Sequence, residues 1–352
     1  MASRLLFILK RREDYSQPHH SNVGLSTGLY NSASFVNQMM IDAGVESKMV
    51  VVADNNCIDR EVTAYRPTHV IIEALWVVPT KFAVLCKLHP SVTWIIRLHS
   101  EMPFLANEGI AMDWIADYVR FPNVIIGVNA PRMMSEVRFY LQTVFGWPQS
   151  ITEDRIIYLP NSYPRATHRK KFDISNREIN IGCFGAIRPL KNHMIQAIAA
   201  VKLAESMNMR LNFHVNAGRL EMKGEPVLHN LRGFFQQLYD RGHKMISHTW
   251  CPREDFLKIC AQMDIGMQVS FSETFNIVGA DLISQGVPMV MSSEVPWVSS
   301  LFCADPTNTD DIFYILERTV KWPALNVWRH QRLLNSYTSE TLTHWLRYFK
   351  QS

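Results

Sequence analysis

The stretch that decides the fold runs from Ser270 to Met291 and reads S-F-S-E-T-F-N-I-V-G-A-D-L-I-S-Q-G-V-P-M-V-M. It opens on a polar loop that contains Glu273, continues as an apolar-periodic helix, and turns at Gly286-Val287-Pro288 into a new apolar run. This order predicts a strand, loop, helix, turn and strand. In such α/β units ligands bind outside the carboxyl ends of the strands, and the N–H groups that open a helix favour a phosphate. Glu273 is therefore expected beside a phosphate site, although an ordinary buried unit with an incidental loop acid fits the same pattern.

The segment resembles the signature of the retaining GT-B glycosyltransferases of family-4 type, which is Glu-x7-Glu followed by a Gly-x-Pro turn. In this resemblance Glu273 is the first acid, Phe275 is the aromatic residue two positions later, and Asp281 is the second acid. Gly286 and Pro288 form the turn. The resemblance implies that Glu273 holds the hydroxyls of the donor sugar and that Phe275 belongs to the donor-binding loop.

The chain departs from that signature at two places. The second acid is Asp281 rather than Glu, and it is one methylene shorter for the contact to the donor ribose that the resemblance implies. Thr274 and Asn276 stand where the family has small residues beside the aromatic side chain. Asn276 is nevertheless expected in the donor-binding loop.

The composition is that of a globular protein with more than one domain. The chain has 352 residues, 47% of them hydrophobic and 19% charged. Its apolar runs are far shorter than the roughly 18 residues of a transmembrane helix, and the N-terminal apolar run precedes its basic residues, the reverse of a signal peptide. We expect a cytoplasmic protein. The six cysteines form no C-x-x-C pair and no metal spacing, so no disulfide framework and no metal site are predicted.

The net charge of +4 is concentrated in two short basic runs. One is Lys10, Arg11 and Arg12, and the other lies between Arg165 and Lys171 and includes His168, Arg169 and Lys170. Such runs fit an anionic acceptor such as nucleic acid or lipid headgroups. The second run also fits a solvated linker between two domains.

Short apolar runs alternate with helical stretches through both halves of the chain. In the first half the predicted strands are the runs at 5–9, 48–53, 69–73, 93–99 and 123–128, and in the second half those at 179–187, 211–217, 245–250, 263–269 and 289–291. Strands that alternate with helices predict parallel, doubly wound sheets. The predicted fold class is α/β with two Rossmann-like domains, and the resemblance implies that they are of GT-B type and face each other across a cleft.

Three features of the first half are candidate site positions. Gly28, at the mouth of the first helix, lets the backbone approach a ligand closely, and Gly44 ends that helix. His99 closes an apolar strand and points to the crevice at its carboxyl end. The resemblance implies that Gly28 and His99 contact the donor. Glu101 is either an acceptor-positioning acid or a surface residue, and Pro160-Asn161 resembles the turn that ends the first domain of the family.

The second half adds two cations and an aromatic residue. Arg188 and Lys191 stand between a strand and a helix, where cations oppose the helix dipole unless an anion lies between them. The resemblance implies that this anion is the donor diphosphate. A solvated basic loop is the alternative. The resemblance further implies that Trp250 lies near the nucleotide base.

The expected domains are 1–164, a Rossmann-like acceptor-side domain; 165–177, a linker; 178–327, a Rossmann-like nucleotide-sugar-binding domain; and 328–352, a helix. The apolar residues of this last segment have roughly helical spacing with a break near Ser336. The resemblance implies that the helix crosses back onto the first domain.

The resemblance implies a retaining glycosyltransferase that moves a sugar from a nucleotide diphosphate, expected to be UDP, to an acceptor hydroxyl. His99, Glu273, Arg188 and Lys191 are the expected catalytic residues, and no metal is expected because the chain lacks an Asp-x-Asp motif. A saccharide is the first acceptor class, and a hydroxymethylated base in phage DNA is the second. A nucleotide-sugar isomerase or epimerase of GT-B fold, and a non-catalytic binding protein, remain alternatives. No cofactor beyond the donor is implied, and the oligomeric state is open.

Overall fold

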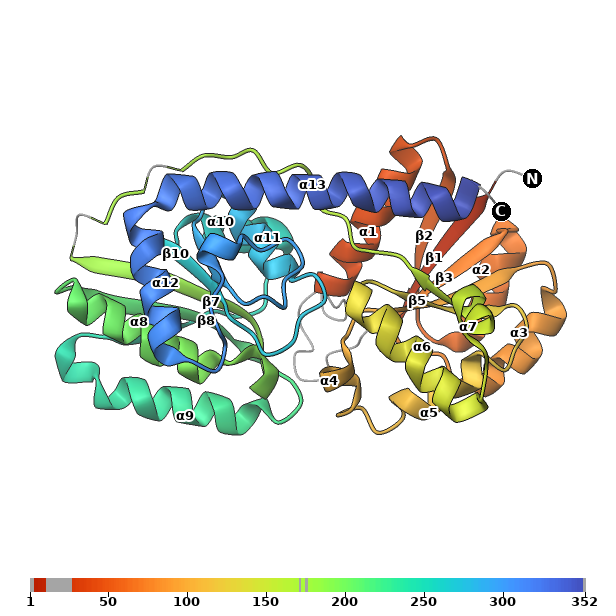
Figure 1. Ribbon diagram of the computed structural model, residues 1–352, viewed down its shortest axis with the longest axis horizontal. Helices are drawn as coiled ribbons and strands as arrows, with labels where there is room; N and C mark the ends of the chain where they lie inside the picture. The colour runs from red at the N-terminus through yellow and green to blue at the C-terminus, as the bar shows by residue number, and fades with distance from the viewer. Residues whose placement is uncertain (1–2, 11–26, 171, 175–176, 351–352) are drawn as a thin grey trace. The chain divides into compact units, whose positions relative to one another are not determined.

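The protein is described here by a computed structural model that covers residues 3–10, 27–170, 172–174 and 177–350. The chain forms two compact units (Figure 1). Unit 1 contains Met1–Pro164 and Thr338–Ser352, and unit 2 contains Arg165–Tyr337.

Unit 1 is built on a parallel sheet of six strands in the order β2-β1-β3-β4-β5-β6. The strands are β1 (Arg4–Lys10), β2 (Glu46–Val52), β3 (His69–Glu73), β4 (Thr93–Leu98), β5 (Val124–Val128) and β6 (Ile156–Tyr158). The first five occupy the predicted apolar runs, whereas the three-residue β6 was not predicted. The order reverses between β1 and β3, which places a topological switch point at their carboxyl ends.

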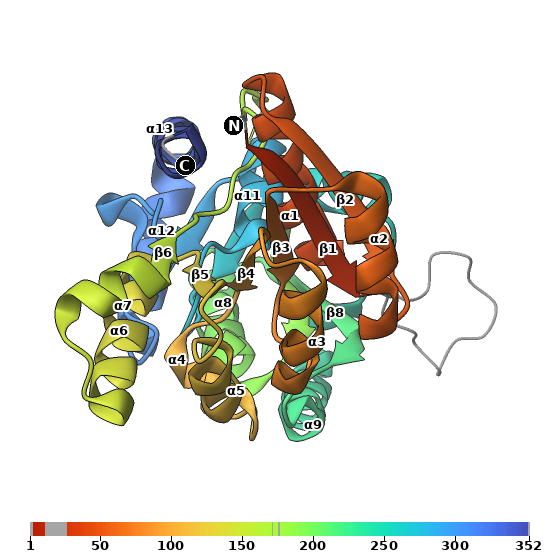
Figure 2. The same ribbon diagram turned by 90° about the vertical axis from the view of Figure 1, so that its right-hand side faces the viewer.

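Helices cover both faces of this sheet, which Figure 2 shows side-on. The helices are α1 (Thr27–Asp42), α2 (Ile58–Tyr65), α3 (Phe82–Leu88), α4 (Met102–Leu105), α5 (Ala111–Tyr118), α6 (Pro131–Phe145) and α7 (Gln149–Arg155). Alternation along β1 decides the two faces: Leu5 and Phe7 pack with α1 and the C-terminal helix, and Leu6 and Ile8 pack with α2, α3, α5 and α6. Both faces are therefore buried, as in a doubly wound sheet.

Unit 2 has a second parallel sheet, in the order β11-β10-β7-β8-β9. Its strands are β7 (Glu178–Ile187), β8 (Arg210–Leu220), β9 (Lys244–Ser247), β10 (Ile265–Gln268) and β11 (Met289–Met291), and its helices are α8 (His193–Ser206), α9 (Gly224–Gln237), α10 (Arg253–Ala261), α11 (Ile277–Ser284) and α12 (Thr309–Lys321). Helices α8, α9 and α12 share one core with β7, β8 and β10. The predicted α/β class with two parallel, Rossmann-like sheets is confirmed.

The C-terminal helix α13 (Pro323–Lys350) is one continuous helix of 28 residues. The predicted break near Ser336 is wrong. The Asn335 side chain exchanges two hydrogen bonds of 3.0 Å with the backbone of Ala166, and this tertiary contact outweighs the weak helix propensity of Asn and Ser. In unit 1 the end of α13 buries Trp345 and Phe349 against the sheet.

The basic segment after Pro164 is held against the rest of unit 2. Gln331 of α13 donates to the His168 carbonyl at 2.6 Å, and Lys170 donates to the Met263 carbonyl at 2.8 Å. Gly286, at φ +74°, lets this segment approach closely, because a Cβ there would lie 2.8 Å from the Lys170 backbone nitrogen. The Gly-x-Pro turn therefore lies at the amino ends of the strands and supports the connecting segment.

Replacing Gly286 by Ala is expected to destabilise unit 2 by about 2–4 kcal/mol, since the methyl group meets backbone atoms as well as a positive φ. Gly242→Ala is the matched control: φ is +81°, but the added Cβ meets only the flexible Arg210 side chain. That variant should lose about 1–2 kcal/mol. Equal losses in denaturant titrations would show that the close approach contributes nothing.

Candidate functional site

The sheet of unit 2 has its topological switch point between β7 and β10. Lys191 lies in the turn after β7, and Glu273 lies in the loop after β10. The Lys191 Nζ and Glu273 Oε1 atoms form an ion pair, and each residue is 8% exposed. Crossovers to opposite sides open the crevice where α/β proteins bind ligands, so this pair stands at the position expected for a site.

Buried amides fix the two loops that carry the pair. Asn192 donates to the Val269 carbonyl at 3.0 Å, and Gln196 bridges the Lys191 carbonyl and the Val269 amide at 2.8 Å each. The Phe271 amide also donates to the Leu190 carbonyl at 2.9 Å. Because these groups are buried and paired, the positions of Lys191 and Glu273 are preorganised.

Arg188 lies at the end of β7 in a second charged group. Its Nη1 is 3.3 Å from Glu221 Oε2, and the other oxygen of Glu221 lies 2.5 Å from Arg219 Nη2. The Arg219 guanidinium lies over the Trp250 ring at 4.9 Å. The sequence did not single out Arg219 or Glu221. Arg219 is near the end of β8 and Glu221 follows it, and neither belongs to the apolar pattern that locates this strand.

The charges of Lys191 and Arg188 both act on the buried side chain of His193. It is 1% exposed, and neither ring nitrogen has a hydrogen-bond partner among the described residues. Burial, together with the positive charges of Lys191 and Arg188, lowers the pKa of His193 to about 3. The two predicted cations thus act on a common position, and His193 remains neutral there.

The other predicted donor-binding residues have partners within unit 2. Asn276 has φ +61°, accepts from the Gly279 amide at 2.8 Å as the cap of α11, and donates to Gln268 at 3.0 Å. Phe275 is 1% exposed and packs against Trp297 and Tyr337. The side chains of Asn276 and Phe275 therefore shape the loop, and their backbone remains the part able to meet a ligand.

Asp281 lies inside α11 and is 3% exposed. Its Oδ1 accepts from Arg253 Nη2 at 3.0 Å, at the start of α10. The structure thus joins Asp281 to Arg253, a residue that sequence reasoning did not single out.

In unit 1, His99 follows β4 and bonds through Nε2 to Glu73, the last residue of β3. Burial lowers the pKa of His99, although the nearby Glu73 raises it. Because a carboxylate only accepts, Nε2 of the neutral ring carries the proton and Nδ1 carries the lone pair.

Glu73 is fully buried and is paired with Arg97, also fully buried, at 3.1 Å. Burial favours the neutral acid, but the charges of Arg97 and His99 outweigh it and hold the pKa of Glu73 below its ordinary value. Arg97 also donates to the carbonyls of Leu159 and Pro160 at 3.1 Å and to the Asn161 side chain at 2.5 Å. The predicted Pro-Asn turn is therefore fixed by the same cation that orients Glu73.

The remaining candidates of unit 1 lie as follows. Glu101 is 3% exposed and pairs with Arg132 at the start of α6, so it is not a free surface acid. Gly28 lies in the first turn of α1, and Gly44 ends that helix at φ +79°. The loop at 22–26 that precedes Gly28 is outside the described residues.

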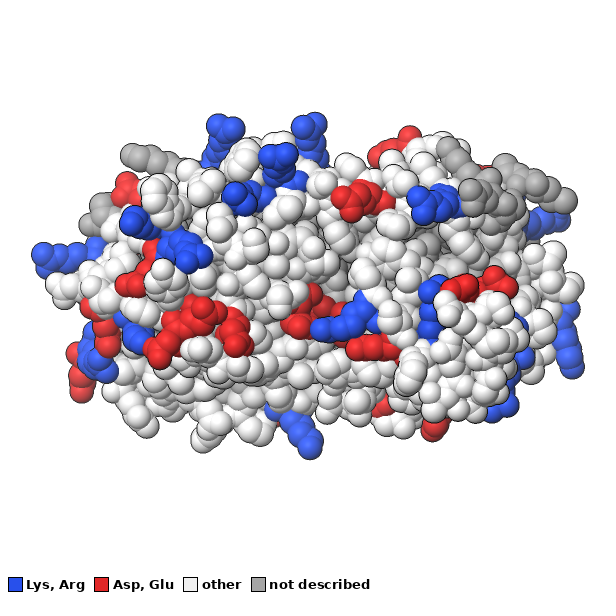
Figure 3. All heavy atoms as spheres, viewed as in Figure 1, with Lys and Arg blue, Asp and Glu red and all other residues white. Residues whose placement is uncertain are grey.

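The structure describes the two predicted basic runs only in part. Lys10 and Arg169 are exposed, and Arg11, Arg12 and Lys171 are outside the described residues. On the face in Figure 3, the Lys and Arg side chains lie in separate groups with Asp and Glu among them.

In the part of the chain that the structure describes, no group of three or more His, Cys, Asp or Glu is arranged to hold a metal ion. No helix in that part of the chain has the length and apolar character to cross a membrane.

No protein-family model matches the chain, and no curated protein matches its sequence. Solved structures with the same fold are found. An α,α-trehalose-phosphate synthase (UDP-forming) from Burkholderia vietnamiensis has a TM-score of 0.71 at 10% identity, over 100% of this chain and 97% of that one. Anabaena Alr3699/HepE in complex with UDP has a TM-score of 0.63 at 10% identity, over 99% of both chains.

A third solved structure is a mutant of S. aureus TarM in complex with Fondaparinux, alpha-GlcNAc-glycerol and UDP. It has a TM-score of 0.57 at 14% identity, over 80% of this chain and 55% of that one. The fold shared with these proteins is GT-B, as predicted.

Replacing Glu73 by Gln is expected to destabilise unit 1 by about 3–5 kcal/mol, because it leaves the buried Arg97 charge without its anion. The matched control is Glu46→Gln, which breaks the exposed pair with Arg4 and should cost at most about 1 kcal/mol. Urea titrations measure both, and similar small losses would contradict a buried charge pair.

The same pair gives a pH dependence. The folded-state pKa of Glu73 is lowered, so its stabilising contribution is complete above the ordinary value of 4.5 and is lost as the pH falls through the folded value. The stability gap between the parent protein and Glu73→Gln should therefore narrow on acidification below that pH. A constant gap in titrations at neutral and acidic pH would contradict the lowered pKa.

Proposed function

We propose that the protein is a retaining glycosyltransferase that moves a sugar from a nucleotide diphosphate sugar to a hydroxyl of a saccharide. The observation that carries this proposal is the buried Lys191–Glu273 pair at the β7/β10 switch point, with Arg188 at the end of the same strand β7. A diphosphate needs fixed cations, and a donor sugar needs an acceptor for its hydroxyls. UDP is the proposed nucleotide, since structures of the same fold carry UDP or are described as UDP-forming.

In the proposed reaction the bond between the sugar C1 and the β-phosphate oxygen breaks, and a bond from the acceptor oxygen to C1 forms on the same face. The proton of the acceptor hydroxyl passes to the leaving diphosphate. Positive charge develops on the sugar and negative charge on the phosphate. No further cofactor and no bound metal are proposed, because Arg188 and Lys191 supply positive charge to the leaving group.

Each residue has a separate task in this scheme. Lys191 and Arg188 neutralise the diphosphate, and the carboxylate of Glu273 stabilises the developing charge of the sugar and accepts from its hydroxyls. His99, oriented by Glu73, is proposed to contact a hydroxyl of the donor sugar. Asp281 is proposed to accept hydrogen bonds from the two hydroxyls of the donor ribose. Its hydrogen bond with Arg253 would have to break for this contact to form.

The direct test is a screen of UDP-, GDP-, ADP- and dTDP-sugars with a panel of saccharides, with products identified by mass spectrometry. Retention is read from the anomeric configuration of donor and product by NMR. Turnover that consumes the nucleotide sugar without an acceptor and without release of nucleotide would instead identify an isomerase or epimerase.

Replacing Glu273 by Gln is expected to lower kcat by roughly 10²–10³, which is about 2.7–4 kcal/mol, because it removes one preorganised charge. It also leaves the Lys191 charge buried without its anion, so stability should fall as well. The double variant Lys191→Met with Glu273→Gln separates the two effects: stability should recover and activity should not. Recovery of activity in the double variant would contradict a catalytic role for the pair.

Replacing Arg188 by Ala is expected to weaken UDP binding by about 1.5–3 kcal/mol, the value of a hydrogen bond between charged groups, and to leave uridine binding unchanged. Calorimetry measures both. Because the substitution also removes one of the two cations paired with Glu221, the control is Arg188→Ala with Glu221→Gln. If that double variant binds UDP as the parent protein does, repulsion by Glu221 explains the loss and Arg188 makes no direct contact.

A further inference from the structure

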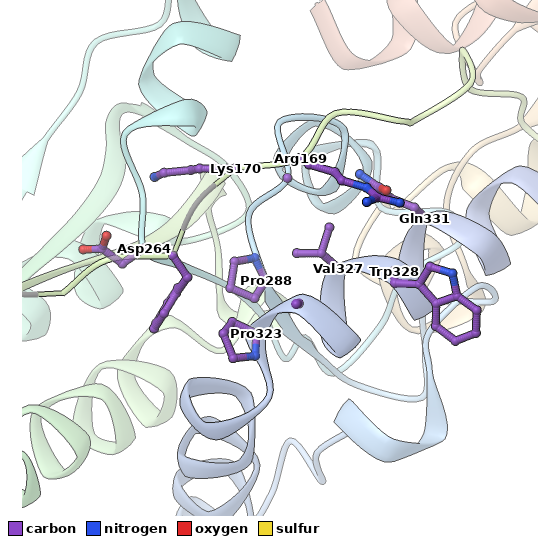
Figure 4. Close-up of a pocket in the computed structure, with 11 residues that line it drawn as sticks. Arg169, Lys170, Asp264, Pro288, Pro323, Val327, Trp328 and Gln331 are labelled. Atoms are coloured by element: carbon purple, nitrogen blue, oxygen red, sulfur yellow. The ribbon is translucent and has the colours of Figure 1, made fainter.

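A separate cavity of about 350 Å³ lies in unit 2, away from the site described above (Figure 4). Asp264 precedes β10 and Gly286 and Pro288 precede β11, so the cavity is at the amino ends of these strands. Lys191 and Glu273 follow the carboxyl ends. The two positions are therefore on opposite edges of one sheet, and the cavity is not explained by the proposed transfer reaction.

The wall of the cavity is mainly apolar. Pro288, Pro323 and Val327 lie together at its centre in Figure 4, and the Trp328 ring lies to one side. Trp328 is 49% exposed, so about half of its side chain is open to contact with a ligand. The volume falls in the range of small-molecule sites, which are apolar pockets with a few polar groups.

Two of the charged residues that line the cavity lie at one end of it and have partners within the protein. At one end Lys170 donates to the Met263 carbonyl, and Asp264 accepts from the backbone and side chain of Asn180 at 2.8 and 3.2 Å. These two residues have protein partners, and their opposite charges offset each other.

Arg169 lies toward the Gln331 end of the cavity in Figure 4 and is exposed. It forms no hydrogen bond or ion pair with any residue that the structure describes. The lining residues that the structure describes include two cations and one carboxylate, a net charge of +1, and among them Arg169 is the cation that no anion balances. A planar guanidinium with free donors is suited to bind a phosphate or carboxylate.

Gln331 supplies a third polar group. Its Nε2 donates to the carbonyls of His168 and Ile283, at 2.6 and 3.2 Å. Its Oε1 can therefore accept a hydrogen bond from a ligand. The cavity thus combines an aromatic and apolar wall, one unbalanced cation and one amide oxygen.

We propose that this cavity binds a small ring compound that carries a phosphate, with the ring against Trp328 and the prolines and the phosphate on Arg169. The ring is either a sugar, whose C–H face packs on an aromatic side chain, or an aromatic ring. An occupant would touch both the segment after Pro164 and α13, the two stretches through which the chain passes between its compact units. The proposal does not depend on the proposed transferase activity.

The test uses the full chain labelled with 5-fluorotryptophan and observed by ¹⁹F NMR. The chain has nine tryptophans, and Trp328→Phe identifies the Trp328 signal by its loss. Phenyl phosphate and glucose 6-phosphate are the ring phosphates, inorganic phosphate tests the anion alone, and phenol and glucose test the rings alone. We expect a saturable shift of the Trp328 signal with a ring phosphate, and the ring that binds more tightly identifies the source of the ligand.

Arg169→Ala should weaken this binding at least about tenfold, the loss expected when a charged hydrogen bond is removed. The matched control is Arg165→Ala, which removes an exposed cation of the same segment outside the cavity and should change nothing. The signal of Trp322, an exposed tryptophan that does not line the cavity, should stay in place.

Three results would overturn the proposal. One is no saturable shift with either ring phosphate up to about 10 mM, which is weaker than a specific site of this kind. Another is equal affinity for inorganic phosphate, which would reduce the cavity to a simple anion site. The third is the same loss from Arg165→Ala as from Arg169→Ala, which would attribute binding to general electrostatic attraction.

Discussion

A fully buried guanidinium, that of Arg97, is the constraint on which unit 1 depends. A charge without water is tolerated only when every donor finds an acceptor, and Arg97 finds them on Glu73, on the carbonyls of Leu159 and Pro160, and on Asn161. The Trp345 ring of α13 lies over the same guanidinium at 5.2 Å, and its Nε1 donates to the Pro160 carbonyl. One cation thus joins two central strands, the end of the sheet and the C-terminal helix. Since Glu73 also holds His99, the geometry of the candidate site in this unit follows from how the buried charge is balanced.

In unit 2, side-chain amides rather than a buried cation pair with the polar groups inside the protein. The loops after β7 and β10 must approach each other at the switch point, and their backbone groups would be left unpaired inside the protein. Asn192, Gln196 and Gln268 supply the missing partners, and Asn276 accepts a left-handed backbone to cap α11. Amides are neutral, so they fix these loops without altering the charge near Lys191 and Glu273. The electrostatic potential at the site is therefore set by its ionised groups.

The sequence was most informative where a short-range pattern decides the outcome. Apolar runs located ten of the strands, and Glu273 and Lys191, predicted from a loop position and a resemblance, do lie together. Glu73 and Arg97 were not recognised as a pair, because each is a single polar residue in an apolar strand and only the register of β3 with β4 sets Glu73 beside Arg97. The continuity of α13 depends on Asn335 and Ala166, which are 169 residues apart, and β6 is too short to show a pattern. Long-range partners, rather than local propensity, account for these failures.

Ion pairs balance the cations at the carboxyl edge of the second sheet. Lys191 pairs with Glu273, Arg188 and Arg219 share Glu221, and Arg253 pairs with Asp281. Cations gathered at one edge would repel one another, and these acids offset that repulsion in the protein without a ligand. A diphosphate that enters the proposed site would therefore exchange partners with carboxylates rather than fill an unoccupied positive pocket. Such an exchange releases Glu273 from Lys191 when the donor is bound, which is when its carboxylate is needed by the sugar.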